Sequence, residues 1–451
     1  MHLGLRGCDD RDLAGDVRPG RRATGAGRAI GGSEAGMAEA TGARSATIAL
    51  VVTLGLATAF SQFYRNSVGV IATTLAGELK LTAAELGTLS SSFFLIFGLC
   101  QIPVGIIIDR YGPRAAMLGS AAFVVIGSFV FAAAGNGGGL IAGRLLLGIG
   151  CSTFLMGPLV IYARAFPPAI FASFAGLQLS ISSLGNIAAT VPLALATETY
   201  GWRAAFVTAG LACALLTLAI FAIVRGPATG PQAGMPRETL AAAFSGVRRA
   251  IRITGFWRLF LIQCATYSTF GLIIGLWGGP YLAHVHGADV TMQGRVLLAM
   301  AVAQVLGMLF WGSADRIVRA YRPVTLAAAG LTALLLLALI GFGHKLSLIG
   351  AGAIIAALGF SCAFAPVLVA HGKALFPAEL TGRGMTLLNI GTVGGGFATQ
   401  WLTGLAVKAV AGPALIYPVA AFQTAFGMQA ALVVVAALVY AGAPDPRRAL
   451  G

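Results

Sequence analysis

One arginine stands inside the first long apolar stretch of the chain, where a charge is costly. Arg65 lies late in the stretch 47–73. A guanidinium keeps its charge at physiological pH, and a charge at membrane depth costs a few kcal/mol or more. In a helix, Thr58, Gln62 and Arg65 share one face at spacings of four and three residues. An embedded arginine on a polar face is a candidate binding residue.

The acidic residues offer Arg65 no obvious permanent partner. Glu78 and Glu85 lie in or beside the loop that follows, and Glu198 lies near the outer end of another apolar stretch. A buried arginine without a carboxylate indicates that an anionic ligand supplies the counter-charge, because a guanidinium binds carboxylate or phosphate in a bidentate manner. Two alternatives stay open: the side chain extends to the outer lipid headgroups, or it bonds to the backbone.

Other polar residues recur at helical spacing within the apolar stretches. Together with Thr58, Gln62 and Arg65, the candidates for substrate binding are Gln178, Asn186, Gln263, Tyr267, Trp277 and Asn389. Amide and aromatic groups that converge on a cavity commonly orient a small ligand. The alternative is that each one bonds neighbouring helices together, and Trp277 also suits the aromatic belt at the membrane interface.

Several chemistries lack the residues they need. The chain has no Walker loop for ATP and no serine, cysteine or metal-ligand constellation typical of hydrolases. His284 and His286 have no third ligand nearby, so a zinc site is not expected. We therefore expect no enzyme activity, no metal and no cofactor. Transport could be coupled to a proton, to a sodium ion or to exchange of one substrate for another.

The composition places these residues in a membrane protein. Hydrophobic residues make up 57% of the 451 residues and charged residues only 10%, against roughly 25% charged residues in soluble domains. A helix needs about 20 apolar residues to cross the hydrocarbon. We therefore expect an all-α membrane protein with twelve spans, at about 47–73, 87–107, 115–134, 140–162, 170–196, 203–224, 257–282, 293–312, 323–342, 347–370, 384–406 and 420–441.

Basic residues are distributed unevenly between the two sides of these spans. If the N-terminus is cytoplasmic, most basic loop residues are cytoplasmic, and those facing the other side are Lys80, Arg203, Arg295, Lys345 and Lys408. This is the positive-inside signature. It predicts an inner-membrane protein with both termini in the cytoplasm. It also assigns the net charge of +15 to contact with anionic lipid, with no nucleic-acid partner.

Polar segments divide the chain into two bundles. The N-terminal segment is rich in glycine and in charges of both signs, which is typical of disorder. The central segment has apolar and basic residues at the spacing of an amphipathic helix. We expect a disordered tail over 1–45, a six-helix bundle over 46–225, a cytoplasmic linker with that helix over 226–256, a second six-helix bundle over 257–442 and a tail over 443–451.

Two short motifs recur in the second half of the chain. Asp109-Arg110, after the second expected span, recurs as Asp315-Arg316 after the eighth. Phe-Pro after the fourth span, at 166–167, recurs after the tenth, at 376–377. The two offsets, 206 and 210 residues, are nearly equal. They indicate two six-helix halves of the same orientation with a central cavity between them.

The chain resembles the Major Facilitator Superfamily of secondary transporters over nearly all of its length after about residue 45. The loop signature Gly-x-x-x-Asp-Arg-x-Gly-x-Arg matches from Gly105 to Arg114, and Gly143-Arg144 begins the signature of the fourth span. Gly-Trp-Arg at 201–203 is also typical. The chain departs from the family pattern where Ala115 stands for a basic residue, and where the second copy of the loop signature lacks its leading glycine.

The resemblance implies gating roles for the residues of these motifs. In the family, the loop aspartate, here Asp109, bonds across the two halves and holds the cytoplasmic side shut in the outward-open state. The alternative is a solvated turn that only fixes orientation. Arg144 is implied to support packing or proton coupling. The gating candidates are Gly105, Asp109, Arg110, Gly112, Arg114, Arg144, Asp315 and Arg316.

The residues around Arg65 look like the organic anion:cation symporter branch, in which an arginine of the first span binds a carboxylate or phosphate. The pattern comprises residues 64–72, Ser91-Ser92-Phe93 and residues 101–105. It implies a secondary transporter that moves a small organic anion by alternating access, and we expect a monomer in the bilayer. Two alternatives are a transporter of neutral, peptide-like or aromatic solutes, and a sensor or assembly factor that binds a ligand without moving it.

Overall fold

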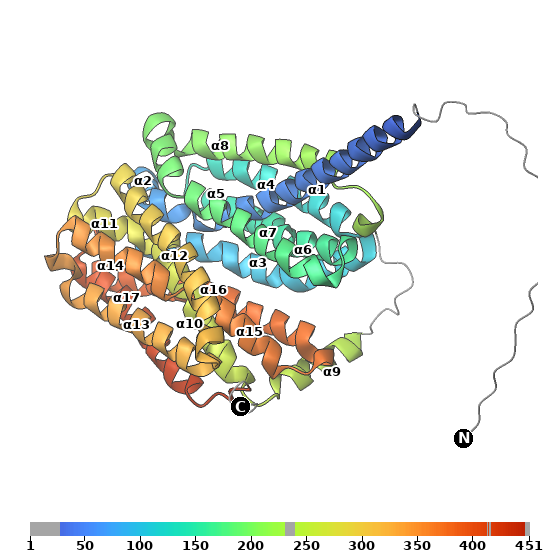
Figure 1. The fold of residues 1–451 in the computed structure, drawn as a ribbon. Helices are drawn as coiled ribbons and strands as arrows, with labels where there is room; N and C mark the ends of the chain where they lie inside the picture. The colour runs from blue at the N-terminus through green and yellow to red at the C-terminus, as the bar shows by residue number, and fades with distance from the viewer. Residues whose placement is uncertain (1–27, 231–239, 413, 415, 447–451) are drawn as a thin grey trace, which may run out of the picture. The chain divides into compact units, whose positions relative to one another are not determined.

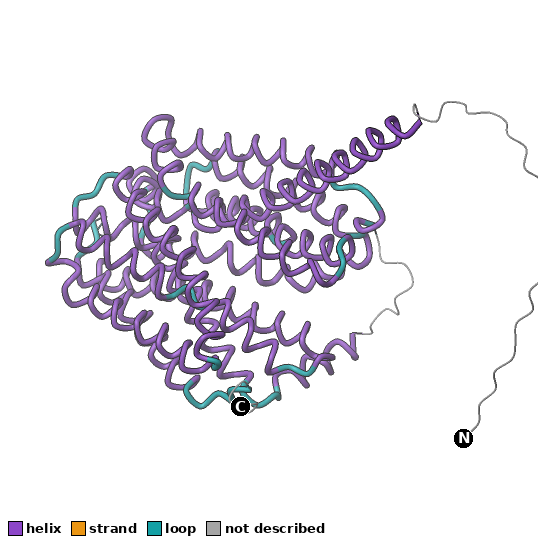
Figure 2. Tube along the Cα trace, viewed as in Figure 1, coloured by secondary structure: helices purple, strands orange, loops and turns teal. Residues whose placement is uncertain are grey.

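The structure is a computed structural model that describes residues 28–230, 240–412, 414 and 416–446. Figure 2 shows helices joined by short loops, and no strand, in these parts of the chain. The all-α class is confirmed. By internal contacts the chain forms two units, Met1–Ile48 and Ala49–Gly451, and every contact described below lies within the second.

Figure 1 shows the order of the helices along the chain. Their bounds are α1 (Arg28–Asn66), α2 (Val68–Leu79), α3 (Ala83–Tyr111), α4 (Pro113–Ala132), α5 (Gly137–Cys151), α6 (Thr153–Ala165), α7 (Pro168–Ala188), α8 (Val191–Ile223), α9 (Leu240–Ile251), α10 (Phe256–Leu272), α11 (Gly278–His286), α12 (Val290–Val318), α13 (Tyr321–Phe342), α14 (Leu348–Ser361), α15 (Ala365–Leu375), α16 (Thr381–Ala411) and α17 (Val419–Tyr440). Short helical turns lie at Pro227–Thr229, Ile273–Trp277, Gly343–Lys345 and Ala378–Leu380.

The helices supply the twelve expected spans. Among the described residues, 10 helical segments are long and apolar enough to cross a membrane. One of them, Ser173–Ile223, contains two expected spans, because Gly201 interrupts α8 with a φ of 82°, a conformation that favours glycine. The remaining span is α16, whose many glycines make it less apolar.

The first, fourth, seventh and tenth spans each contain an irregularity, and the fifth has a further one at 189–190, between α7 and α8. The first span breaks at Ser67, between α1 and α2, and the fourth breaks at Ser152, between α5 and α6. The seventh contains the π-helical turn Ile273–Trp277, and the tenth is interrupted at 362–364. The breaks therefore repeat with offsets of 206 and 210 residues, the same offsets as the sequence motifs. Breaks in membrane helices free backbone groups that must find other partners.

The turns on one side carry residues that start helices. Thr82, Asn136, Asp289 and Ser347 each accept a hydrogen bond from the backbone N–H three residues on, which makes each an N-cap. Thr82 and Glu85 also form a capping box. These turns lie on the side expected to face outward, called here the outer end. The opposite side, with the α3–α4 turn at Gly112, is called the inner end.

The N-terminal segment and the central linker were expected to lie outside the two bundles. α1 begins at Arg28, so residues 28–45, expected within a disordered tail, are helical. Their many alanines favour a helix, and residues 1–27 lie outside the described part. The amphipathic helix expected in the linker lies at α9, where Arg248 and Arg249 are exposed and Ala250 is buried.

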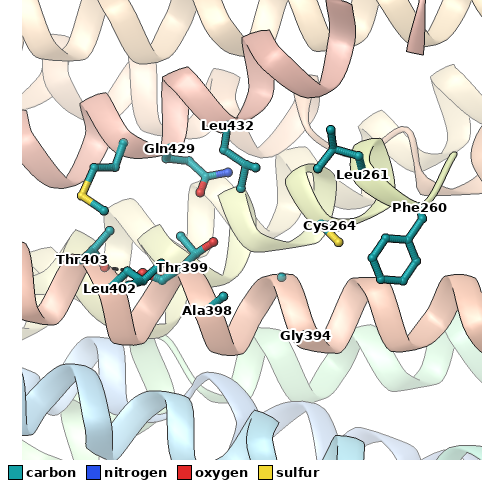
Figure 3. Close-up of a pocket in the computed structure, with 12 residues that line it drawn as sticks. Phe260, Leu261, Cys264, Gly394, Ala398, Thr399, Leu402, Thr403, Gln429 and Leu432 are labelled. Carbon is teal, nitrogen blue, oxygen red and sulfur yellow. Dashed lines mark hydrogen bonds between the residues drawn. The ribbon is translucent and has the colours of Figure 1, made fainter. Parts of the chain in front are cut away.

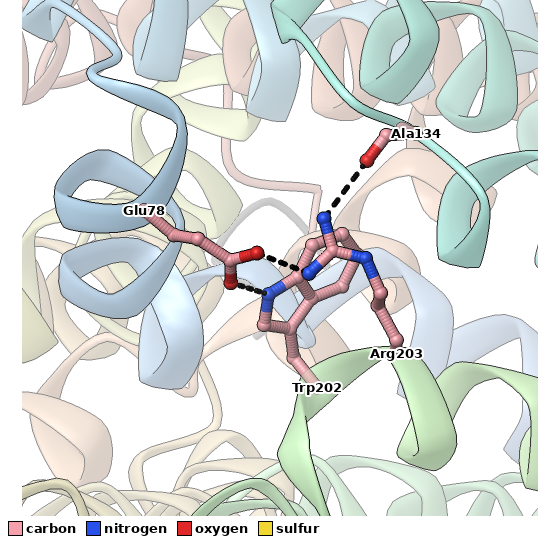
Figure 4. Close-up of polar contacts among 4 residues, drawn as sticks. All are labelled: Glu78, Ala134, Trp202 and Arg203. Carbon is pink, nitrogen blue, oxygen red and sulfur yellow. Dashed lines mark hydrogen bonds and ion pairs between the residues drawn. The ribbon is translucent and has the colours of Figure 1, made fainter.

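A glutamate, a tryptophan and an arginine hold the outer end of the first half (Figure 4). Trp202 Nε1 donates to the Glu78 carboxylate at 2.6 Å, and Arg203 forms an ion pair with the same group. Arg203 also donates to the Ala134 carbonyl at 3.2 Å. The hydrogen bond from Trp202, followed by that from Arg203, lowers the pKa of Glu78, because both favour its charged form. The Trp-Arg motif thus ties α2, α8 and the α4–α5 turn together.

The two halves meet along α3 and α16, which run antiparallel. Near the outer end their backbones touch, since a Cβ added to Gly87 would lie 2.7 Å from the Gly404 Cα. A Cβ at Gly98 would meet the Val393 side chain at 3.1 Å, whereas at Gly105, nearer the inner end, it would meet nothing within 4 Å. The halves are therefore closed at the outer end and separate toward the inner end.

A second contact closes the outer end. The carboxylate of Glu198, in α8, accepts hydrogen bonds from the Thr291 backbone N–H at 2.8 Å and from its hydroxyl at 2.5 Å. Thr291 lies in the first turn of α12, where a carboxylate is favoured by about 0.3–1 kcal/mol. This bond joins the first half of the chain to the second.

Gly404→Val should force the outer end open, because its side chain would overlap the α3 backbone. Gly394→Val is the matched control on the same helix, since a Cβ there meets nothing within 4 Å. Double electron–electron resonance between spin labels at positions 80 and 408 measures the distance between the two halves at the outer end, in membranes. We expect a longer distance in Gly404→Val alone. An unchanged distance in that variant would contradict the close glycine contact.

Candidate substrate site

Arg144 is fully buried and is held by backbone carbonyls. Its guanidinium donates to the carbonyls of Tyr64 and, at 3.4 Å, Arg65, in the last turn of α1. It also donates to the carbonyls of Leu89 and Ser90 in α3, each at 3.3 Å. Carbonyls in the last turn of a helix lack intrahelical partners, and a cation there is favoured by the helix dipole. Arg144 therefore caps α1 where that helix breaks.

Arg65 lies in the last turn of α1, immediately before this break. Its side chain is half-buried, and Nη1 donates to the Tyr267 hydroxyl in α10 at 3.3 Å. The buried Nε has no protein partner. Among the described residues the recorded ion pair is that of Arg203 with Glu78, so no carboxylate there neutralises Arg65.

Aromatic rings surround the Arg65 guanidinium. Its central carbon lies 4.7 Å from the ring centre of Phe97, 5.6 Å from that of Tyr267, 5.7 Å from that of Phe94 and 6.0 Å from that of Phe93. Ring faces attract a cation by about 0.5–2 kcal/mol, but they do not cancel its charge. The guanidinium therefore lies between α3 and α10 with its charge still available to an anion.

The first half of the chain uses most of its predicted binding residues for packing. Thr58 donates to the Phe154 carbonyl at 2.5 Å and accepts from Gln178, which also accepts from Tyr162 at 2.8 Å. Thr58 and Gln178 are buried and join α1, α6 and α7.

The amide of Asn186 is also engaged by the protein. The Asn66 amide donates to Asn186 Oδ1 at 2.8 Å, which links α1 to α7, and both residues are buried. Gln62 is half-buried, one turn before Asn66 on α1, and its backbone carbonyl accepts from the Asn66 amide at 3.3 Å.

In the second half, Tyr267 is the predicted residue that lies beside Arg65. Gln263, one turn away on α10, donates to the Thr392 hydroxyl at 2.9 Å. Trp277 is fully buried and donates to the Thr403 hydroxyl at 2.9 Å, so it packs within the helices and does not lie in an interfacial belt. Asn389 is half-buried on α16. The structure thus brings Arg65 and Tyr267 together. Most of the other predicted residues bond to the protein instead, and Gln62 and Asn389 are half-buried.

The loop motif binds the start of the linker. A Cβ at Gly112, where φ is 84°, would lie 2.5 Å from the Gly230 backbone, so only glycine permits this contact. Arg114 donates to the Phe221 carbonyl at 2.8 Å, in the last turn of α8, where carbonyls need partners. Asp109 and Arg110 are exposed.

The structure does not test the gating roles of the remaining motif residues. Exposed carboxylate and guanidinium groups at 109–110 are compatible with a latch released at an open inner end, and the latch itself stays a prediction. Asp315 and Arg316 lie in α12, but their side chains lie outside the described part of the structure.

Two functional features were not predicted from the sequence. The rings of Phe94 and Phe97 were not assigned a role, although their spacing on α3 places both near one face. The carbonyl partners of Arg144 were also missed, because a sequence does not show where a helix will break. A serine in an otherwise apolar span, such as Ser67, is a weak signal of a break.

A separate cavity of about 430 Å³ lies between α10, α16 and α17 (Figure 3). Its walls are mostly apolar, with Thr399, Thr403 and Gln429 as polar exceptions. None of the predicted binding residues lines it. An apolar cavity without a cation does not suit an anion, so Arg65 and Tyr267 form the better candidate site.

Replacing Arg144 should destabilise the protein strongly. Arg144→Met removes the guanidinium bonds to four backbone carbonyls, although the Tyr64 carbonyl keeps its bond from the Ser67 hydroxyl at 3.1 Å. A lost bond to a charged donor costs about 1.5–3 kcal/mol, so the free energy of unfolding should fall by roughly 2–5 kcal/mol. Arg144→Lys keeps the charge but has fewer donors, so its free energy of unfolding should lie between those of the wild-type protein and Arg144→Met. Arg295→Met, at an exposed position, is the control. Unfolding in mixed micelles measures all three, and a stable Arg144→Met protein would contradict the capping role.

Comparisons with known proteins were made for the sequence and for the fold. The sequence pattern described as Major Facilitator Superfamily matches residues 54–399. The probable L-galactonate transporter of Escherichia coli is 27% identical over 282 residues, which are 59% of this chain and 59% of that protein. The methylenomycin A resistance protein of Bacillus subtilis is 25% identical over 354 residues, 67% of this chain and 75% of that protein.

A further relative and a solved structure agree with this assignment. The gentisate transporter of Corynebacterium glutamicum is 28% identical over 144 residues, 31% of this chain and 32% of that protein. A bacterial homologue of the human lysosomal transporter Spinster, solved in an inward-facing and unoccupied conformation, superposes with a TM-score of 0.71 at 18% identity, covering 87% of this chain and 95% of that one. With its twelve spans and its repeated halves, this chain is a multi-pass membrane transporter that belongs to the Major Facilitator Superfamily.

Proposed function

We propose that this protein is a secondary active transporter that moves a small organic anion by alternating access. The observation that carries the proposal is the Arg65 guanidinium, which is half-buried among membrane helices without a carboxylate partner in the described residues. A charge in that environment costs several kcal/mol unless something neutralises it. A substrate carboxylate or phosphate supplies that charge.

The electrostatics of the site favour an anion further. Arg144 lies directly behind Arg65, and its Nη2 donates to the Arg65 carbonyl at 3.4 Å. Its own donors are occupied by carbonyls, so it does not bind the substrate, yet its charge adds to the potential at Arg65. Two cations in a low-dielectric surrounding concentrate anions from solution.

The arrangement of the halves suits alternating access. Arg65 in α1 and Tyr267 in α10 belong to different halves, so a ligand between them contacts both. The outer end is closed by the glycine contact of α3 with α16 and by the Glu198–Thr291 bonds. We propose that this arrangement is the inward-open state, and that the exposed Asp109 engages when the inner end closes.

Two names among the relatives support an organic anion: galactonate and gentisate are both carboxylates. The coupling ion is proposed to be a proton or sodium. We further propose a monomer in the inner membrane with both termini in the cytoplasm, as the distribution of basic residues predicts.

Removing the Arg65 charge should abolish anion transport. In proteoliposomes, counterflow of labelled benzoate, gluconate and phosphate should identify the anion that the wild-type protein moves. Flux of that anion should fall at least about tenfold in Arg65→Ala, the loss expected when a charge-assisted bond disappears. Arg65→Lys should keep part of the flux, and Arg295→Ala, exposed on α12, should keep all of it.

The alternatives give different results in the same experiment. Flux that persists in Arg65→Ala would support a transporter of neutral solutes. An anion that binds to the wild-type protein but is not transported by it would support a sensor. Either result would overturn the proposed role of Arg65 in transport.

A further inference from the structure

We propose that the substrate is an aromatic carboxylate, whose ring stacks on Tyr267 while its carboxylate pairs with Arg65. This inference rests on the proposed function, because it takes Arg65 as the anion-binding residue. It adds the substrate class and names Tyr267 as the residue that determines specificity.

The nearest wall of the anion site is aromatic. Phe93, Phe94 and Phe97 lie beneath the guanidinium and are each less than 4% exposed, whereas Arg65 and Tyr267 are half-buried and remain accessible. A ligand that reaches Arg65 therefore lies against the Tyr267 ring. Aromatic rings stack favourably on a tyrosine face in offset or edge arrangements.

Tyr267 is held in position to receive a ring. Its ring packs edge-on against Phe94, with centroids 6.2 Å apart, and lies tilted against Phe270 at 6.5 Å. Its hydroxyl oxygen accepts the 3.3 Å bond from Arg65. That bond is long, and a carboxylate forms shorter, stronger bonds with a guanidinium. A carboxylate can therefore take over Arg65 Nη1 and bind end-on across Nη1 and Nη2, while the Tyr267 hydroxyl becomes free to donate to it.

A polyhydroxylated acid would need many polar partners, and most of the polar side chains named above already bond to the protein, with Gln62 and Asn389 as exceptions. Thr58 and Gln178 bond to each other, and Asn186 bonds to Asn66. Gln263 bonds to Thr392. Each sugar hydroxyl that entered without a partner would lose its bonds to water. The site as built thus favours a flat apolar ring with one carboxylate over a sugar acid.

The test uses three monocarboxylates that differ in a controlled way. Benzoate and cyclohexanecarboxylate have the same carbon skeleton, but only benzoate has an aromatic face; gluconate is the polyhydroxylated competitor. Their binding to the purified full chain is measured by equilibrium dialysis of labelled benzoate with unlabelled competitors. We expect benzoate to bind roughly five- to tenfold more tightly than cyclohexanecarboxylate, from ring-stacking strengths, and gluconate to compete weakly.

Two variants of Tyr267 separate the ring from the hydroxyl. Tyr267→Phe keeps the ring and should keep the preference for benzoate over cyclohexanecarboxylate. Tyr267→Leu should bring the two ligands to within about twofold of each other. If Tyr267→Leu does not fold, the comparison in the wild-type protein and in Tyr267→Phe still tests whether the site prefers an aromatic carboxylate.

The outcomes for the two proposals are distinct. Gluconate that binds more tightly than benzoate, in a manner that depends on Arg65, would overturn the aromatic class and leave the anion transporter intact. Equal binding of benzoate and cyclohexanecarboxylate to the wild-type protein would also overturn it. Binding of all three anions that is unchanged in Arg65→Ala would overturn the proposed function itself.

Discussion

The contact of the buried Arg144 guanidinium with the carbonyls at the end of α1 determines the geometry of the site. A break in a membrane helix frees backbone carbonyls that must find partners within the protein, even where, as at Ser67, the chain continues directly into the next helix. Arg144 supplies donors to the carbonyls of Tyr64 and Arg65 and at the same time holds the α3 backbone at Leu89 and Ser90. The break in the first span is thereby stabilised, and Arg65, two residues before it, is fixed between α3 and α10.

This contact also explains how the protein holds two arginines in its membrane region without nearby acids. Arg144 is compensated by carbonyl dipoles, which occupy its donors. Among the described residues, the partners of Arg65 are ring faces and one tyrosine hydroxyl, so it retains capacity for an anion. Two residues of the same type thus have different roles because their hydrogen-bond partners differ.

Much of this architecture follows from the sequence because it depends on composition and periodicity. The spans are visible in the sequence as long apolar stretches, and the repeated halves as recurring motifs. The isolation of Arg65 is visible because no acidic residue lies within the apolar stretches. The partners of Thr58, Gln178, Asn186 and Trp277 were not predictable, since helical spacing tells which residues share a face and not what lies opposite. The early start of α1 at Arg28 was obscured by glycines and mixed charges. The break at Ser67 is stabilised by the tertiary contact of Arg144, and the serine itself is only a weak local signal of it.

The central claim is that Arg65 holds the anion, between the two halves. Diffraction from crystals grown with 4-iodobenzoate tests it most directly, because the anomalous signal of iodine locates the ligand without assumptions about its pose. We expect an iodine peak beside Tyr267, with the carboxylate against Arg65, and loss of that peak in Arg65→Ala. A peak confined to the apolar cavity between α10, α16 and α17, or one that persists beside Tyr267 in the variant, would contradict it.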